Sequence, residues 1–404
     1  MNAFKRTAIA LGVATALSLG TAHAQVSDNL IKIGVLTDMS SLYTDLAGAG
    51  SVVAAKLAVE DSGIEKRGYK VEVISADHQN KADVGSSVAR QWYDVDKVDV
   101  IVDTPNSGVA LAVSQITRDK GKAFLASGPG SSDLTGAKCS PNTVHWAYDT
   151  WMLANGTGTA ITKGGGDSWF FISADYAFGA ALERDTAAAV IKNGGKVIGG
   201  VKAPLNTQDF SSFLLQAQAS KAKIIGLANA GGDTTNSIKQ AAEFGIVKGG
   251  QKLAGLLVFL TDIHALGLQT AQGLTFTETF YWDQNDASRA FAKRFSALDK
   301  GIYPTMVHAG VYASVLHYLK AVEALKSDDG TKVVAKMKEM STDDPLFGKG
   351  TIRVDGRKIH PAYLVQVKTP AESKAPWDYY KIVATIPADQ AFRPLADGGC
   401  SLVK

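Results

Sequence analysis

Short apolar segments alternate with alanine-rich amphipathic segments along much of this sequence, and that alternation restricts the possible folds more than any other feature. In the first part of the chain we expect strands at 31–36, 70–75, 98–102 and 123–126, and helices between them at 46–61, 82–93 and 108–120. Strands that alternate with helices build a parallel sheet with helices on both faces. The first part of the chain is therefore predicted to be an α/β unit.

A second series of the same kind begins near residue 168. Its strands are expected at 169–173, 196–201, 223–227 and 253–259, and its helices at 179–193, 210–219 and 234–244. The two series share this architecture but no detailed residue repeat. The chain is thus predicted to hold two parallel sheets of the same design.

The alternation stops after residue 273, where a segment rich in threonine and aromatic residues begins. Helices without strands between them follow, and the chain then turns to short antiparallel strands; we expect the β-rich segment at 274–282, the helices at 287–299, 304–326 and 332–340, and the last strands within 350–386. Because the late helices have no sheet of their own, we expect them to pack on the first unit. The chain would then cross between the units more than once, which makes the connection a hinge and the cleft beside it a ligand site.

The first 24 residues have the features of a cleavable signal peptide. Lys5 and Arg6 precede an uncharged apolar run at 7–19, and Ala22-His23-Ala24 forms an A-x-A cleavage pattern. An uncleaved anchor is the alternative, but the apolar run is shorter than the roughly 20 residues that span a bilayer. We expect export to the periplasm and a mature chain that starts at residue 25 and has no membrane span.

Size and charge narrow the class of protein further. Without residues 1–24, about 380 of the 404 residues remain, which favours two domains. The formal charge of the whole chain is +3, and the leader contributes two of the positive charges. A nearly neutral chain without basic clusters argues against nucleic acid as a partner.

The chain has two cysteines, Cys139 and Cys400. In an oxidising compartment two such thiols are candidates for a disulfide, and two unpaired thiols are the alternative. A bridge would tie the C-terminal tail to the middle of the chain. In the chain-entropy description a loop of this length contributes about 5 kcal/mol, less any strain.

Four segments, spread in order along the chain, carry a family resemblance. They are IKIGVLTDMSSLYTDLAGAGSVVAAKLAVED, VDVIVDTPNSGVALAVSQI, AFLASGPGSSDLT and WFFISADYAFGAALERD. Together they resemble periplasmic solute-binding proteins of the leucine/isoleucine/valine type, which serve branched-chain amino acid-type ABC importers. The resemblance implies the type I periplasmic binding fold, an α/β fold of two Rossmann-like lobes with parallel sheets joined by a three-pass hinge, and it suggests a monomer.

The resemblance also implies where the chain passes between the lobes. The three crossings are expected near His145, Thr279 and Phe347. One lobe would comprise residues 25–146 and 279–346, and the other would comprise residues 147–278 and 347–404. This division agrees with the periodicity, which also returns the late helices to the first unit.

Candidate ligand contacts lie where strands end, because ligands of open α/β sheets bind at the carboxyl ends of strands near helix N-termini. Asn106 or Ser107 can cap the helix that follows strand 98–102, where free N–H groups and the helix dipole favour a carboxylate. Ser107 matches the serine that binds a carboxylate in the family. A plain helix cap without a ligand is the alternative.

The next loop holds Ser127, Gly128 and Gly130. Its glycines let the backbone approach a ligand closely. The family position that usually carries a hydroxyl for the ligand falls on Gly130, which weakens the usual grip on an amino-acid carboxylate. An ordinary turn is the alternative here.

The second series contributes aromatic and polar candidates. Tyr176 or Phe178 would cover an apolar or aromatic ligand body, and one of the two is expected to pack in the core. Amino-acid-binding relatives hold an ammonium group with a tyrosine and a carboxylate. This chain has Asn229 and Ala230 without a tyrosine, and Asp262 as the one plausible carboxylate.

These departures set the expected ligand class. A buried ammonium group needs charged and hydrogen-bonding partners. We therefore favour an aromatic or other small carboxylate without an ammonium group, and a branched-chain or other amino acid is the alternative. Four more residues are placed at the border of the cleft, either as ligand contacts or as packing: Tyr43, Leu46, Trp146 and Tyr148.

An enzyme is the main rival to a binding protein. The sequence has no H-E-x-x-H, G-x-S-x-G or G-x-x-x-x-G-K-[ST] motif, and its histidines lack the spacing of metal ligands. We predict no catalytic residues, cofactor or metal, and we expect two partners, a small-molecule ligand and the permease of an ABC importer. A ligand sensor that docks on a membrane receptor would use the same cleft and is a further alternative.

Overall fold

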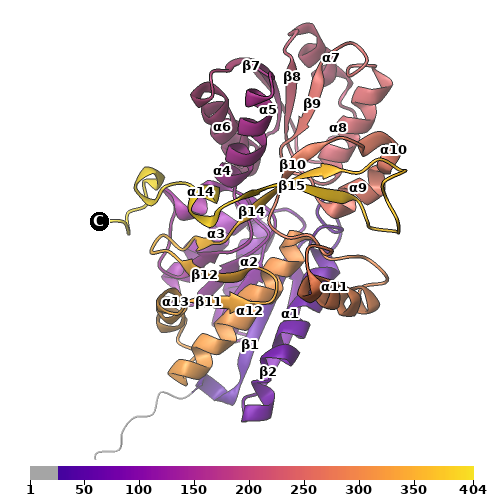
Figure 1. Ribbon diagram of the computed structural model, residues 1–404. Coiled ribbons are helices and arrows are strands. Elements are labelled where there is room, and N and C mark those ends of the chain that lie inside the picture. The colour runs from indigo at the N-terminus through magenta and orange to yellow at the C-terminus, as the bar shows by residue number, and fades with distance from the viewer. Residues whose placement is uncertain (1–25) are drawn as a thin grey trace, which may run out of the picture.

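The structure is a computed structural model that describes residues 26–404, so the predicted leader lies outside the described residues. Figure 1 shows two lobes, each built on its own sheet and flanked by helices. Within residues 26–404 every helix is too short or too polar to span a bilayer. The predicted fold class, two α/β lobes with parallel sheets, is confirmed.

The first lobe is built on five parallel strands in the order β2-β1-β3-β4-β5. Its strands are β1 (Ile31–Thr37), β2 (Val71–Asp77), β3 (Val100–Asp103), β4 (Ala123–Ala126) and β5 (Thr143–His145), and its helices are α1 (Gly48–Ser62), α2 (Ala82–Asp94) and α3 (Ser107–Asp119). Strands β3 and β4 are buried on both faces, which is typical of parallel strands covered by helices. The predicted strands and helices of this part are confirmed within a few residues.

The second lobe is built on four parallel strands in the order β7-β6-β8-β9. Its strands are β6 (Ser168–Ala174), β7 (Lys196–Ala203), β8 (Ile224–Ala228) and β9 (Lys252–Gly255), and its main helices are α6 (Ala177–Lys192), α7 (Ser211–Ala219), α8 (Gly232–Glu243), α9 (Leu260–Leu266) and α10 (Leu268–Ala271). The strand predicted at 253–259 ends at Gly255. A Cβ on Gly255 would lie 2.6 Å from Val258, so the chain folds back on itself there and carries residues 256–259 into a buried loop.

A helical segment after the first crossing was not predicted. It comprises α4 (Thr150–Leu153), a π-helical turn (Ala154–Gly158) and α5 (Thr159–Lys163). Asp149 caps its start by accepting a hydrogen bond from the N–H of Met152 at 2.8 Å. Glycine and threonine have low helix propensity, so the sequence of this segment does not predict a helix. Gly156 is needed for packing, because a Cβ there would lie 2.2 Å from Thr277 Oγ1.

The late helices pack on the first lobe, as the sequence indicates. They are α11 (Asp286–Leu298), α12 (Met306–Leu325) and α13 (Gly330–Glu339). Helix α12 lies along α1 and is buried over most of its length. His308 and His317 on this helix face the core, and burial lowers the pKa of each to about 4, so both are neutral at neutral pH.

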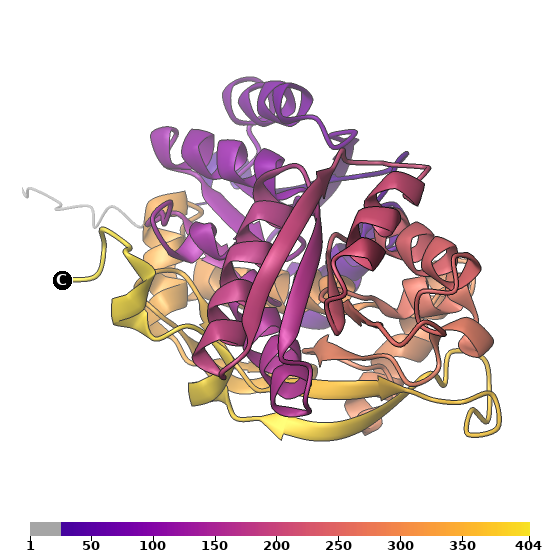
Figure 2. The ribbon, with the colours of Figure 1, turned by 90° about the horizontal axis from the view of Figure 1, so that it is seen from above.

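The last strands form two antiparallel sheets, β10-β14-β15 and β11-β12-β13. They are β10 (Thr275–Glu278), β11 (Thr342–Asp344), β12 (Gly348–Ile352), β13 (Lys358–Ile359), β14 (Ala362–Val367) and β15 (Tyr380–Ile386), followed by α14 (Ala388–Ala391). Figure 2 shows β14 and β15, in yellow, side by side along one side of the molecule.

The positions of β11, β12 and β13 indicate where the chain passes between the lobes for the third time. The backbone of Arg357 forms an isolated parallel β-bridge with that of His145, the last residue of β5, and β12 contacts α13. Strands β11–β13 therefore lie with the first lobe. This arrangement favours a third crossing between Ile359 and Ala362 rather than near Phe347. The division into 25–146 with 279–346 and 147–278 with 347–404 remains a prediction.

A disulfide joins Cys139 to Cys400, with the two Cα atoms 5.6 Å apart and a sequence separation of 261. It fastens the C-terminal tail to the loop before β5. Both cysteines are buried.

Replacing Cys139 and Cys400 together by serine is expected to lower the free energy of unfolding by about 2–4 kcal/mol, because the unfolded chain regains the entropy that the long loop closure removes. Urea unfolding of the variant and the parent under non-reducing conditions measures this difference. Reducing the parent protein should reproduce it. Equal unfolding midpoints in all three samples would contradict the prediction.

Candidate functional site

A small cavity, with a volume of about 10 Å³, lies between the two lobes. The loops after β1 and β3, the first crossing and the loops after β6, β8 and β9 all contribute to it. The lining residues are Tyr43, Leu46, Pro105, Tyr148, Tyr176, Phe178, Ala230, Leu257 and Phe259. Five of these nine side chains are aromatic, and none carries a charge at neutral pH. The structure thus brings together six residues predicted from the sequence at the border or floor of the cleft: Tyr43, Leu46, Tyr148, Tyr176, Phe178 and Ala230.

The lobes touch across this cavity. The hydroxyl oxygens of Tyr43, from the first lobe, and Tyr176, from the second, are 2.5 Å apart in a hydrogen bond. Burial raises the pKa of both phenols, so both are protonated at neutral pH. Gly231 adds a second contact, because a Cβ there would lie 2.8 Å from the carbonyl oxygen of Leu42. The cavity is therefore closed by contacts that open lobes would not make.

The aromatic walls have defined partners. The Tyr148 hydroxyl donates to the carbonyl oxygen of Gly128 at 2.5 Å, and its ring meets Phe259 edge to face with centroids 6.0 Å apart. The rings of Tyr176 and Phe178 are 6.0 Å apart. Sequence reasoning expected one of these last two residues to pack in the core. Phe178 does belong to the hydrophobic core, and both residues also line the cavity.

Asn106 and Ser107 lie just behind the cavity wall that Pro105 forms. Asn106 caps α3, since its side chain accepts from the N–H groups of Gly108 at 2.9 Å and Val109 at 3.1 Å. The Ser107 hydroxyl is buried and accepts from the N–H of Ser131 at 3.1 Å, which leaves its own hydrogen to donate. Neither side chain lines the closed cavity.

The loop after β4 belongs to the first lobe and contacts the aromatic residues that line the cavity. Ser127 is buried against α12, with its hydroxyl 3.3 Å from that of Ser314. Gly130 faces the aromatic residues, because a Cβ there would lie 2.7 Å from Phe178 and 2.9 Å from Tyr148. Of the loop's predicted residues, Gly130 is the one that borders the cavity.

The polar side chains predicted as ligand contacts in the second lobe form hydrogen bonds within the protein. Asn229 accepts from the Thr234 hydroxyl at 2.8 Å and donates to the Ser237 hydroxyl at 3.1 Å. Asp262 accepts from the N–H of Phe259 at 2.9 Å. Burial raises the pKa of Asp262 to about 7. Neither side chain lines the aromatic cavity, but Asp262 lines a neighbouring pocket of about 440 Å³ that residues of both lobes form, Leu46 among them.

Trp146 is fully buried in the core and does not line the cavity, whereas Leu46 does. Pro105, Leu257 and Phe259 were missed as lining residues. Pro105 follows a strand that was predicted correctly, so its position could have been found. Leu257 and Phe259 were assigned to a strand, and only the early end of β9 turns them toward the cleft. Within residues 26–404 no group of three His, Cys, Asp or Glu side chains is placed to hold a metal ion.

Asp103, the last residue of β3, was also missed. Its carboxyl group is fully buried beneath the loop after β4, where a Cβ on Gly128 would lie 2.4 Å from Oδ1. Burial raises the pKa of Asp103 to about 7, against a smaller opposing effect of nearby hydroxyls. Asp103 and Thr104 both have positive φ, 77° and 64°. Such strain in non-glycine residues is common at ligand sites.

The Asp103 carboxyl is expected to make the protein less stable as the pH rises from about 4 to about 7. In that window the folded protein keeps a proton that the unfolded chain, with a pKa of 3.8, has released. Stability therefore falls, by up to about 1.4 kcal/mol per pH unit. Asp103→Asn should remove this contribution, which urea unfolding across the window would measure. A variant with the same slope as the parent would contradict this assignment.

Comparison with known proteins agrees with this geometry. The family model described as periplasmic binding protein matches residues 30–374. A periplasmic binding protein from Burkholderia mallei is 53% identical and superposes with a TM-score of 0.90, over 93% of this chain and 100% of the other. A branched chain amino acid ABC transporter periplasmic ligand-binding protein from Burkholderia xenovorans LB400 is 41% identical, with a TM-score of 0.82 and the same coverage.

More distant structures share the fold. A solute-binding protein of an ABC transporter from R. palustris, solved in complex with benzoate, is 22% identical with a TM-score of 0.79, over 92% of this chain and 99% of the other. At that identity the likeness concerns the fold alone. The family match covers most of the chain and includes both sheets and the cavity between them. The chain therefore belongs to the periplasmic binding protein family.

Proposed function

We propose that this protein is the extracytoplasmic solute-binding component of an ABC importer and that it encloses a small aromatic carboxylate between its lobes. One observation carries the ligand class: the nine side chains that line the cavity are aromatic or aliphatic, and three tyrosine hydroxyls are their only polar groups. The closed cavity holds only about 10 Å³, so the lobes must move apart to admit a ligand. A flat apolar ring would then lie between such walls, and the hydroxyls can orient a polar substituent.

The cavity offers poor conditions for an ammonium group. Asp233 interacts electrostatically with Tyr43 and Tyr176, and Asp103 interacts with Tyr148. Both carboxyl groups are buried, and burial raises the pKa of Asp233 to about 6 and that of Asp103 to about 7, which disfavours the anion that would hold a cation. The carboxylate of the ligand would instead meet the N-terminus of α3, where the Ser107 hydroxyl has a hydrogen to donate and the helix dipole attracts an anion.

The mechanism rests on closure. A ligand that contacts both lobes favours the closed arrangement, because only that arrangement makes the contacts of the second lobe. A permease that recognises the closed surface then receives the loaded protein. Residues 1–24 would direct export, so that the protein meets its ligand in the periplasm.

The bound benzoate of the R. palustris protein is consistent with an aromatic acid in this fold. The printed name of the Burkholderia xenovorans protein supports the second candidate, a branched-chain amino acid, and Leu46 and Leu257 would suit such a side chain.

Calorimetric titration of the chain from residue 25 onward with benzoate, 4-hydroxybenzoate and leucine separates the candidates. We expect binding of the aromatic acids and none of leucine. Ser107→Ala should weaken the aromatic acids by about 1–3 kcal/mol, since it leaves the ligand charge short of a donor. Ser211→Ala, also at the first position of a helix, is the matched control and should bind normally. Binding of leucine alone would overturn the proposed ligand class, and an unchanged affinity of Ser107→Ala would remove Ser107 from the site.

A further inference from the structure

A second and larger pocket lies in the second lobe, at the edge of the sheet opposite the interlobe cavity. Its volume is about 540 Å³, within the range of small-molecule sites. The residues that begin β8 and β9 line it, whereas the interlobe cavity is lined where strands end. The two sites are therefore separated by the length of the sheet.

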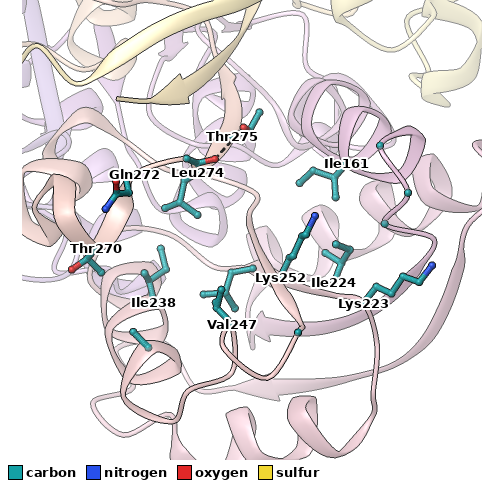
Figure 3. A pocket seen from close by; sticks show the side chains of 17 residues that line it. Ile161, Lys223, Ile224, Ile238, Val247, Lys252, Thr270, Gln272, Leu274 and Thr275 are labelled. Atoms are coloured by element: carbon teal, nitrogen blue, oxygen red, sulfur yellow. Dashed lines mark hydrogen bonds between the residues drawn. The ribbon is translucent and has the colours of Figure 1, made fainter. Parts of the chain in front are cut away.

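The walls of this pocket are largely apolar. Ile161 of α5, Ile224 at the start of β8, and Leu274 before β10 surround its centre, as Figure 3 shows. Ile238 and Val247 extend the apolar surface on the side of α8. A pocket of this kind can bury the hydrocarbon part of a ligand.

The rim is kept open by glycines. Gly165, Gly250 and Gly273 line the pocket with φ values of 95°, 100° and 82°, a backbone conformation that favours glycine. A Cβ on any of the three would meet no atom within 4 Å. The backbone thus turns at the rim without placing side chains over the opening.

The charged side chains in the lining are both lysines, Lys223 and Lys252. Lys223 is paired with Asp167, with Nζ and Oδ2 2.8 Å apart. In the part of the chain that the structure describes, Lys252 has no ion-pair partner. Figure 3 shows its ammonium group extending toward Ile161, between the apolar walls. An unpaired cation beside apolar surface is complementary to a molecule with one anionic group and an apolar body.

We propose that this pocket is a second ligand site, separate from the interlobe cavity, that binds an amphipathic organic anion with its charge on Lys252 and its apolar body against Ile161, Ile224 and Leu274. The site does not depend on the ligand of the interlobe cavity, so each can be tested while the other is blocked.

The probe is 8-anilinonaphthalene-1-sulfonate, an aromatic anion whose fluorescence rises in apolar surroundings. We expect saturable binding to the parent protein. Lys252→Gln should weaken it about fivefold, the effect of losing a partly exposed charge pair. Ile161→Glu, which places a carboxylate beside Lys252, should weaken it more than tenfold. Lys192→Gln, on the exposed face of α6, is the matched control and should bind as the parent does.

Two further measurements keep this test decisive. Gly130→Leu, which presses a side chain against the Phe178 and Tyr148 rings of the interlobe cavity, should leave probe binding unchanged, and the thermal midpoints of the lysine variants should equal that of the parent. Probe binding that is lost in Gly130→Leu would place the probe between the lobes and overturn the proposal. Equal probe affinity of Lys252→Gln, Ile161→Glu and the parent would overturn it as well. Decanoate and 1-naphthoate as competitors would then show whether the site takes a chain or a flat ring.

Discussion

Gly130→Ala is expected to lower ligand affinity about 10- to 100-fold, and Gly130→Leu is expected to abolish binding. A Cβ at this position would lie 2.7 Å from the Phe178 ring and 2.9 Å from the Tyr148 ring. Both rings are 2% exposed and have little space in which to yield. Overpacking of this kind costs roughly 1–3 kcal/mol, and each 1.4 kcal/mol is tenfold in affinity.

Ligand affinity is expected to fall because the substitution prevents the lobes from closing fully. Phe178 belongs to the second lobe and Gly130 to the first, so a side chain at residue 130 holds the lobes apart where the aromatic walls must meet. Calorimetric titration with the aromatic acids measures the effect. Gly249→Ala, on an exposed loop at the other edge of the second sheet, is the matched control and should bind normally. If Gly130→Leu bound as tightly as the parent, the closed cavity could not be the ligand site.

The fold followed from the sequence because its determinants are periodic. The alternation of buried strands and amphipathic helices repeats over many residues, and a misplaced boundary changes little. The helical segment at 150–163 escaped because its glycines and threonines serve close packing against β10 and α6 rather than helix propensity. Tertiary contacts stabilise the helical segment at 150–163, and such contacts cannot be predicted from a local sequence pattern.

The candidate site was predicted from the sequence less completely than the fold, for a different reason. Tyr43, Tyr148, Tyr176 and Phe178 were found because they lie in the loops or the first helical turn after strand ends, where this fold places its ligands. The role of Phe259 depended on where β9 ends, and the strain at Asp103 and Thr104 depended on backbone angles. Distances between loops that are far apart in sequence are set by the packing of whole elements.

The polar residues show the same limit. Asn106, Asn229 and Asp262 were predicted as ligand contacts, but each uses its side chain to satisfy backbone or side-chain groups of its own lobe. A sequence shows which groups can donate or accept. It does not show which partner takes them, and that choice separates a helix cap from a ligand contact.

Arg357→Met is expected to lower the free energy of unfolding by about 3–5 kcal/mol, the largest effect on stability that we predict. The Arg357 side chain is 0% exposed. Its guanidinium donates to the carbonyl oxygens of Trp146, Tyr148 at 2.9 Å and Lys358 at 3.0 Å, and it lies 3.4 Å from Asp149. Removing it leaves a buried carboxylate and three carbonyl groups without their partner.

A matched exposed arginine isolates burial as the cause. Arg289 forms ion pairs with Asp283 and Asp286, but its side chain is 45% exposed, so Arg289→Met should cost less than about 1 kcal/mol. In Arg357→Met, Asp149→Asn should restore part of the loss, because the neutral amide no longer needs a counter-charge and can still cap α4. Urea unfolding of these three variants and the parent measures these differences. Similar losses for Arg357→Met and Arg289→Met would refute the argument.

The same contacts link stability to ligand binding. Arg357 comes from the last pass of the chain and holds the backbone on both sides of residue 147, in the first pass. Tyr148 depends on that backbone for the position of its ring in the cavity wall. Arg357→Met should therefore weaken the aromatic acids even where the variant is still folded, although Arg357 is absent from the cavity lining. Titration at a temperature well below the unfolding midpoint tests this, and an unchanged affinity would show that the crossing is held by its other contacts.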